Sequence, residues 1–154
     1  MIMNLQNHFQ KLAADEKRMA HIILCEFALD KWNEYVSANG EIRYIETVCG
    51  TERIIEKSLP ADAIGSVKMK REDPRIEERL REPITAIRDG DLELPETMKF
   101  ALHSFYNLYR KYMRGDDIDD WLIVNQALSA DENFDFIKEF LARTIKSVKN
   151  ISER

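Results

Sequence analysis

The sequence predicts an all-α protein, a single-domain helical bundle of about six to seven helices that spans residues 1–154. Apolar residues recur at intervals of three and four along most of the chain. Only five Gly and four Pro interrupt 154 residues, and no alternating apolar and polar run is bounded by hairpin turn residues. A chain of this length buries about 70 % of its unfolded surface. We therefore expect it to fold without a metal or a disulfide.

Two helices are predicted at the N-terminus. An apolar stripe over residues 5–12 predicts a short first helix. From residue 15 to about residue 38, apolar positions cover more than one helical face, which is typical of a central helix surrounded by others. Asn39 and Gly40 follow as a helix stop.

Residues 42–59 are predicted to form the third helix. Their apolar residues again fit a 3.6-residue period, although Gly50 costs about 1 kcal/mol relative to Ala and a bend is expected there. Cys49 lies in this pattern and Cys25 in the central helix, so both are predicted to be buried free thiols. They lack the Cys-x-x-Cys spacing of zinc and redox sites. Residues 61–70 are expected to form a short helix with a basic end.

Prolines and aspartates mark the next two helices. Asp73 and Pro74 read as an N-cap and a first helical position. The stripe that follows runs to about residue 89 with Pro83 inside it, where the helix either kinks or divides. Pro95 opens a long helix that ends at Gly115, and its basic last turn, RKYMR, suits the carbonyl end of the helix dipole.

Two helices are predicted after residue 115. Asp116 or Asp117 is expected to cap the first, and the capping box Ser-Ala-Asp-Glu at 129–132 is expected to begin the last. No signal segment opens the chain, and no apolar run approaches the roughly 18 residues that cross a membrane. We expect a soluble, cytoplasmic protein with no membrane contact.

The net charge of −5 is unevenly distributed. Residues 89–96 hold four carboxylates and residues 116–135 hold seven, with no Lys or Arg in either segment. The remaining chain has 23 bases and 17 acids, so the acidity is local. Duplex DNA would have to avoid both segments.

Metal-binding patterns are incomplete. The sequence DDIDD at 116–120 matches the Asp-Asp-x-x-Asp magnesium pattern of helical isoprenoid synthases in Asp116, Asp117 and Asp120, but a second acidic cluster is needed and helix capping explains these residues better. DGDLE at 89–93 matches the opening of an EF-hand calcium loop, but the glycine and the final glutamate of such a loop are missing. The three histidines form no known ligand set. We expect no metal and no cofactor.

The sequence leaves two classes of function open, nucleic-acid binding and an enzymatic or ligand-binding activity. Residues 100–114 place five aromatic side chains beside Arg110, Lys111 and Arg114, a combination that can stack nucleobases but is more typical of a core with a capped helix end. The chain could thus be a regulatory nucleic-acid-binding protein, although nucleic acid is disfavoured by the acidic segments. It could also be a small helical enzyme or ligand-binding protein, with carboxylates and His103 in a pocket between helices.

The segment REPITAIRDGDLELPETMKFALHSFYNLYRKYMRGDDIDDWLIVNQALSA, residues 81–130, resembles small all-helical immunity proteins of bacterial toxin systems. The resemblance lies in overall pattern and carries over no site residues. It implies a cytoplasmic, non-catalytic protein that binds a cognate toxin domain, often a basic nuclease, and blocks its active site.

The leading prediction is therefore a non-catalytic protein-binding module, an immunity or inhibitor protein that neutralises a bacterial toxin domain through an acidic surface. Acidic residues steer basic partners, and an aromatic residue beside them can anchor an interface. The alternative is that the aspartates form a solvated surface and that the tryptophan belongs to the hydrophobic core. The predicted partner-binding residues are Asp89, Asp91, Glu93, Asp116, Asp117, Asp119, Asp120 and Trp121.

Overall fold

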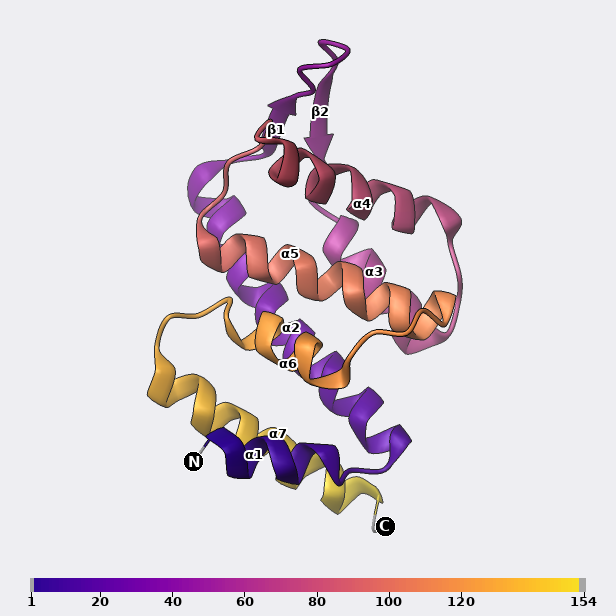
Figure 1. Ribbon diagram of the computed structural model, residues 1–154, viewed down its shortest axis with the longest axis vertical. Helices are drawn as coiled ribbons and strands as arrows, with labels where there is room; N and C mark the ends of the chain where they lie inside the picture. Colours follow the sequence, from indigo (N-terminus) through magenta and orange to yellow (C-terminus); the bar gives the residue numbers. More distant parts are fainter. Residues whose placement is uncertain (1, 153–154) are drawn as a thin grey trace.

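The structure, a computed structural model, describes residues 2–152 and the side chains of residues 4–150. The predicted fold class is confirmed: within these residues seven α-helices pack around one core, with only a small two-stranded sheet beside them (Figure 1). The elements are α1 (Ile2–Gln10), α2 (Ala14–Asn39), β1 (Ile42–Ile45), β2 (Glu52–Ile55), α3 (Leu59–Met69), α4 (Pro74–Asp89), α5 (Glu96–Tyr109), η1 (Arg110–Arg114), α6 (Asp120–Leu128) and α7 (Phe134–Ser152).

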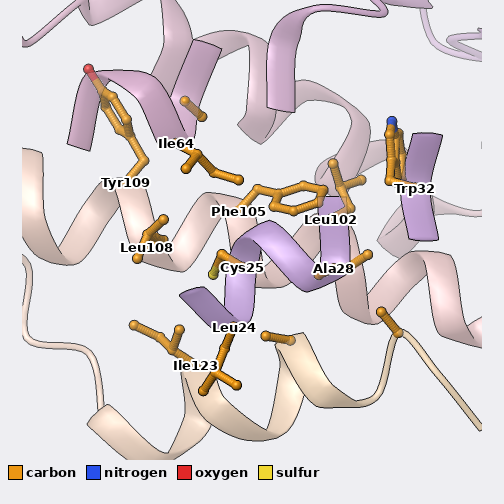
Figure 2. Packing of buried hydrophobic residues seen from close by; sticks show 14 of the residues in the cluster. Leu24, Cys25, Ala28, Trp32, Ile64, Leu102, Phe105, Leu108, Tyr109 and Ile123 are labelled. Carbon is orange, nitrogen blue, oxygen red and sulfur yellow. The ribbon is translucent and has the colours of Figure 1, made fainter. Parts of the chain in front are cut away.

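Helix α5 lies at the centre of the bundle. It packs against α2, α3, α4 and α6, while α1 and α7 cover the far side of the core. Its apolar residues spread around the helix because it has neighbours on several sides. Figure 2 shows α2 side chains beside those of α5, and the ring of Trp32 meets that of Phe105 edge to face at 6.0 Å. The residues labelled there are Leu24, Cys25, Ala28 and Trp32 of α2, Ile64 of α3, Leu102, Phe105, Leu108 and Tyr109 of α5, and Ile123 of α6.

Helix α2 is the second central element, as predicted from its apolar residues on several faces. The predicted burial of Cys25 is confirmed, and burial raises the pKa of its thiol to about 12. The helix ends at Gly40, whose amide donates to the carbonyl of Val36 at 2.8 Å. Gly40 has φ 85° and ψ −178°, a conformation that is essentially restricted to glycine.

The prediction of a helix over residues 42–59 is wrong, because the chain there forms a hairpin. Strands β1 and β2 pair antiparallel, and the loop between them contains Gly50 at φ +66°. Ile42 and Tyr44 are buried while Arg43 and Ile45 are exposed, the alternation of a strand with one covered face. Short apolar runs fit both a helical and a strand period, so the pattern was ambiguous over four residues. Figure 1 shows the hairpin projecting beyond α4.

Three predicted details change with this structure. Cys49 lies in the hairpin loop and is exposed, so its predicted burial is wrong. Asp119, rather than Asp116 or Asp117, caps α6, since its carboxylate accepts from the amide of Trp121 at 3.0 Å. The predicted capping box at 129–132 does not begin the last helix.

The last helix begins at Phe134 because the side chain of Asn133, rather than that of Ser129, accepts a hydrogen bond from the first turn. The Asn133 side-chain oxygen accepts from the amide of Phe136 at 3.1 Å. Ser129 instead closes α6.

Other local predictions are confirmed. The Asp73 carboxylate accepts from the amide of Arg75 at 3.0 Å and caps α4, with Pro74 in the first turn. Helix α4 continues through Pro83 as a single helix, so it does not divide there. Within the described residues, no helix combines the length and apolar character that crossing a membrane requires.

The two phenylalanines of the central helix α5 differ in their exposure to solvent. Phe105 is 0 % exposed and Phe100, on the same helix, is 40 % exposed. We expect Phe105→Ala to lower the free energy of unfolding by about 3–5 kcal/mol, because it leaves a cavity in the core. The control Phe100→Ala is expected to change it by about 0.5 kcal/mol or less. Urea unfolding followed by circular dichroism measures both, and equal losses would contradict the central placement of α5.

Candidate functional site

The predicted partner-binding residues fall into two groups at opposite ends of α5. Asp89, Asp91 and Glu93 lie where α4 passes to α5, and residues 116–121 lie between η1 and the first turn of α6 (Figure 1). The 14 residues of α5 extend about 21 Å at about 1.5 Å per residue. The two groups therefore form separate surfaces, and each has its own electrostatic setting.

Most carboxylates in the group at residues 116–121 already form hydrogen bonds or ion pairs within the chain. Asp116 accepts from Arg110 Nε at 3.0 Å. Asp120 lies 2.8 Å from Lys111 Nζ and 3.3 Å from Lys17 Nζ. Burial alone would raise the pKa of Asp120, but the hydrogen bond and charge of Lys111, with Lys17, hold it below its usual range.

The remaining carboxylates of this group differ from each other. Asp119 is used as the N-cap of α6. Asp117 is exposed, and no ion pair of the described residues includes it. The surface at residues 116–121 is thus largely compensated within the chain.

A buried histidine ties this segment to α2. His21 Nε2 lies 2.8 Å from the carbonyl oxygen of Asp120, and Nδ1 lies 2.6 Å from the Tyr112 hydroxyl. A carbonyl only accepts, so Nε2 carries the proton and Nδ1 accepts from the hydroxyl. Burial lowers the pKa of His21 to about 4, so the ring is neutral at pH 7. This network fixes the start of α6.

Trp121 packs on the same network and contributes to the structure of the bundle. Its ring lies 6.0 Å from that of Phe9, which lies 5.3 Å from the His21 ring. The indole is half-buried against α1. A packing role accounts for this residue without a partner.

The basic turn RKYMR forms the π-helix η1, and its cations are also paired. Arg114 lies 3.2 Å from the largely buried Glu77 carboxylate. Lys111 donates to the carbonyl of Ile118 at 2.8 Å in addition to its contact with Asp120. These cations hold the chain together here, which does not favour the nucleic-acid alternative.

The group at residues 89–93 lies beside the hairpin. The backbone amide and the hydroxyl of Thr47 both donate to the Asp91 carboxylate, which fastens the hairpin loop to the segment after α4. A cavity of about 190 Å³ opens between the hairpin loop and α4. The acidic cavity, as we call it, is lined by Glu46, Val48, Arg81, Glu82, Thr85, Ala86, Asp89 and Asp91.

Negative charge exceeds positive charge in the acidic cavity. Its lining has four carboxylates and one guanidinium. That guanidinium, on Arg81, is 3.6 Å from Glu77, outside the cavity. Asp91 is held by Thr47, a neutral residue. Cations from outside the lining also lie here, since Arg88 Nε is 3.3 Å from Asp89 and Arg53 Nε is 2.8 Å from Glu46. No ion pair of the described residues includes Asp91, so the uncompensated charge of the acidic cavity lies at Asp91.

Neighbours outside the lining keep one of these carboxylates ionised. Cys49 Sγ donates to Glu46 at 3.0 Å and Arg53 Nε donates to it at 2.8 Å. These hydrogen bonds, that from Cys49 first, hold the pKa of Glu46 below its usual range despite desolvation. Arg53 also lies 3.9 Å from Glu82. An ionised carboxylate suits the binding of a cation better than the donation of a proton.

Apolar side chains lie exposed next to this charge. Val48 is 98 % exposed at the mouth of the acidic cavity, and Ile45 and Ile54 are 60 % and 42 % exposed on the hairpin. Exposed apolar residues rimmed by polar ones are typical of interaction sites. Glu93 is exposed in the loop beyond Asp91 and does not line the cavity.

The size and ligand geometry of the acidic cavity restrict its chemistry. At about 190 Å³ it is smaller than the roughly 300–1,000 Å³ of small-molecule sites. No group of three or more His, Cys, Asp or Glu in the described part of the chain is arranged to hold a metal ion. His103, considered for an enzymatic pocket, does not line it. The dimensions and charge suit one cationic side chain.

Sequence reasoning missed Glu46, Val48 and Glu82 as members of this site. Reading residues 42–59 as a helix placed the first two on a helical face, far from the acidic segment after α4. The available signal in the sequence was the short apolar, polar, apolar order of Ile42, Arg43 and Tyr44.

The buried histidine gives the protein a specific acid sensitivity. The native pKa of His21 is about 4 and that of an unfolded histidine is 6.5, so between these values the unfolded chain binds a proton that the folded chain excludes. Stability from this residue is fully present above pH 6.5 and is lost as the pH falls to 4, by about 3 kcal/mol at 1.36 kcal/mol per pKa unit.

We therefore expect the stability difference between the wild type and His21→Gln to shrink by about 3 kcal/mol from pH 7 to pH 4. Urea unfolding at both values measures it, with the exposed His8→Gln as the matched control. A difference that is the same at the two pH values would contradict a buried neutral His21.

The acidic group at the hairpin borders a cavity and has exposed apolar side chains beside it. No family model, curated protein or solved structure matches this chain. A function is therefore inferred from the contacts and charges of the acidic cavity and the hairpin.

Proposed function

We propose that the chain is a non-catalytic protein-binding module whose hairpin end takes a basic partner. The observation that supports this most is the acidic cavity, where three separate segments bring Glu46, Glu82, Asp89 and Asp91 around one small space. Only folding assembles this set, since its first and last residues, Glu46 and Asp91, are 45 positions apart in the sequence. A Lys or Arg side chain matches both its charge and its size.

The surroundings of the acidic cavity support a role in association. Excess carboxylate charge attracts a basic protein over several ångströms and raises the rate of encounter. Val48, Ile45 and Ile54 then supply apolar area that a partner covers, which removes water from the charged contact. One end of the molecule thus both attracts a basic protein and offers apolar area that excludes water from the charged contact.

The partner class that we propose is a basic domain of a bacterial toxin. The resemblance to helical immunity proteins covers residues 81–130, which include Glu82, Asp89 and Asp91. A nuclease holds phosphates with Lys and Arg, so a carboxylate-lined surface offers it complementary charge. The proposed role is to bind and neutralise such a domain in the cytoplasm.

Affinity capture from the native host at low salt tests this proposal. We expect the tagged wild type to retain one basic protein in stoichiometric amount, whose association slows as salt rises because surface charge is screened. Mass spectrometry identifies the protein, and an assay of its nuclease or toxic activity with and without the chain measures neutralisation.

Charge-neutral variants locate the surface. We expect Glu82→Gln with Asp89→Asn to weaken binding at least about tenfold, or about 1.4 kcal/mol, because both carboxylates line the acidic cavity. Asp117→Asn, an exposed residue of the other acidic group, is the matched control and is expected to bind like the wild type. Loss of binding with Asp117→Asn alone would instead place the interface at residues 116–121.

A further inference from the structure

The hairpin carries backbone groups that face outward on both edges. Glu46 N donates to Thr51 O at 3.0 Å, so these residues form a hydrogen-bonded pair at the loop. Pairs alternate along an antiparallel ladder, which makes Tyr44 with Arg53 and Ile42 with Ile55 the next hydrogen-bonded pairs. The amides and carbonyls of the intervening residues point away from the partner strand. These residues are Arg43 and Ile45 in β1 and Glu52 and Ile54 in β2.

No third strand covers these groups in the described part of the chain, where the sheet has two strands. An exposed edge is a template for pairing with another chain, and a two-stranded hairpin is at best marginally stable without further packing. Here the buried side chains of Ile42, Tyr44 and Ile55 anchor the base of the hairpin on the bundle. The hairpin is thus held in place while its edges remain open.

The two edges differ in what lies beside them. Along β1, a second cavity of about 480 Å³ is lined by Arg43, Tyr44, Ile45, Thr47, Glu52, Gly90 and Asp91. Arg43 is paired with Glu41 and Glu52. Asp91 lines this space and the acidic cavity, so the two are adjacent. Beside β2, the lining of the neighbouring cavity includes Arg53 and Arg79, which pair with glutamates. The open backbone of β1 and the carboxylate of Asp91, which no ion pair of the described residues includes, therefore meet along this edge.

We propose that β1 accepts an extended segment of the partner as a third strand, and that a Lys or Arg of this segment enters the acidic cavity. The basic character of the segment rests on the function proposed above, whereas the pairing rests on the open edge. Backbone hydrogen bonds to Arg43 and Ile45 would supply affinity, and the charged side chain would supply specificity.

The register of the hairpin specifies the pattern of the segment. Residues directly opposite each other across a ladder lie on the same face. A partner residue opposite Tyr44 points to the inner face, toward Asp91. A residue opposite Ile45 points to the outer face, where Ile45 and Ile54 are exposed. The segment should therefore place a basic residue next to a β-branched or aromatic one.

A random dodecapeptide library displayed on phage, selected on the full-length wild type, provides the probe. We expect the selected peptides to carry a Lys or Arg flanked by β-branched or aromatic residues. Titration calorimetry then gives their affinities for the wild type and for Ile45→Pro, Ile54→Pro and Glu82→Gln. Circular dichroism checks that each variant retains the fold.

The two proline variants are matched controls for each other. Each removes one outward amide and no hydrogen bond of the β1–β2 ladder, and proline is tolerated at such edge positions. We expect Ile45→Pro to weaken peptide binding at least tenfold, because it removes a backbone donor to the added strand, and Ile54→Pro to weaken it about threefold or less, because it changes only an apolar contact on the outer face. If Ile45→Pro unfolds the hairpin, amide hydrogen exchange measured by NMR on the wild type tests the strand addition instead. Saturating peptide should slow the exchange of the Arg43 and Ile45 amides at least tenfold and leave the exchange of the Glu52 and Ile54 amides unchanged.

The outcomes separate the two proposals. If Glu82→Gln weakens binding while Ile45→Pro and Ile54→Pro bind alike, strand addition at β1 is overturned and the basic partner stands. If no peptide is selected, strand addition is overturned, and the capture experiment with Glu82→Gln and Asp89→Asn decides the proposed function separately. If the selected peptides lack basic residues, the basic character of the partner is overturned. If the free chain dimerises in sedimentation and Ile45→Pro abolishes the dimer without affecting peptides, a second copy occupies the edge and the proposed mode is wrong.

Discussion

Burial of α5 on several sides is the constraint on which the rest of the structure depends. Helices α2, α3, α4 and α6 each use part of its surface, so the ends of α5 determine where the neighbouring loops lie. At one end, the turn into α5 carries Asp91 against the hairpin loop. At the other end, η1 brings Tyr112 back to His21. A change that displaces α5 would therefore disturb both acidic groups together.

The two ends of α5 use carboxylates in different ways. Around Asp116 and Asp120, cations from α2 and η1 lie within 2.8–3.3 Å, and the main chain is fixed by a neutral buried histidine. Buried or half-buried pairs of this kind hold elements in position more than they add stability. Around the acidic cavity, carboxylates outnumber cations and apolar side chains stay exposed. In the first arrangement the half-buried carboxylates are paired with lysine or arginine, whereas in the second Asp91 lines a cavity and has no ion pair among the described residues.

Much of the fold could be predicted from periodicity and capping. The central position of α2, the N-cap at Asp73 and the end of η1 at Gly115 each follow from patterns within one element. The hairpin could not be separated from a helix because four-residue strands give too few apolar positions to distinguish the two periods. The error also displaced Cys49 from the surface to the predicted core.

The site was harder to predict because it depends on contacts between elements. Asp89 and Asp91 were recognised as acidic residues, but their neighbour Glu46 comes from the hairpin and Glu82 from the middle of α4. Nothing in the local sequence distinguishes Asp91, which lines a cavity, from Asp120, which is paired with two lysines. Net charge by segment gives the number of carboxylates and omits the cations that folding brings to them.

Hydrogen–deuterium exchange of the chain, alone and in complex with the basic partner that we propose, tests most directly whether the hairpin end is the binding surface. The account predicts slower exchange on binding in residues 41–55 and 82–91, with residues 116–121 unchanged. Slower exchange confined to residues 116–121 would contradict it and would place the interface at the compensated end of α5.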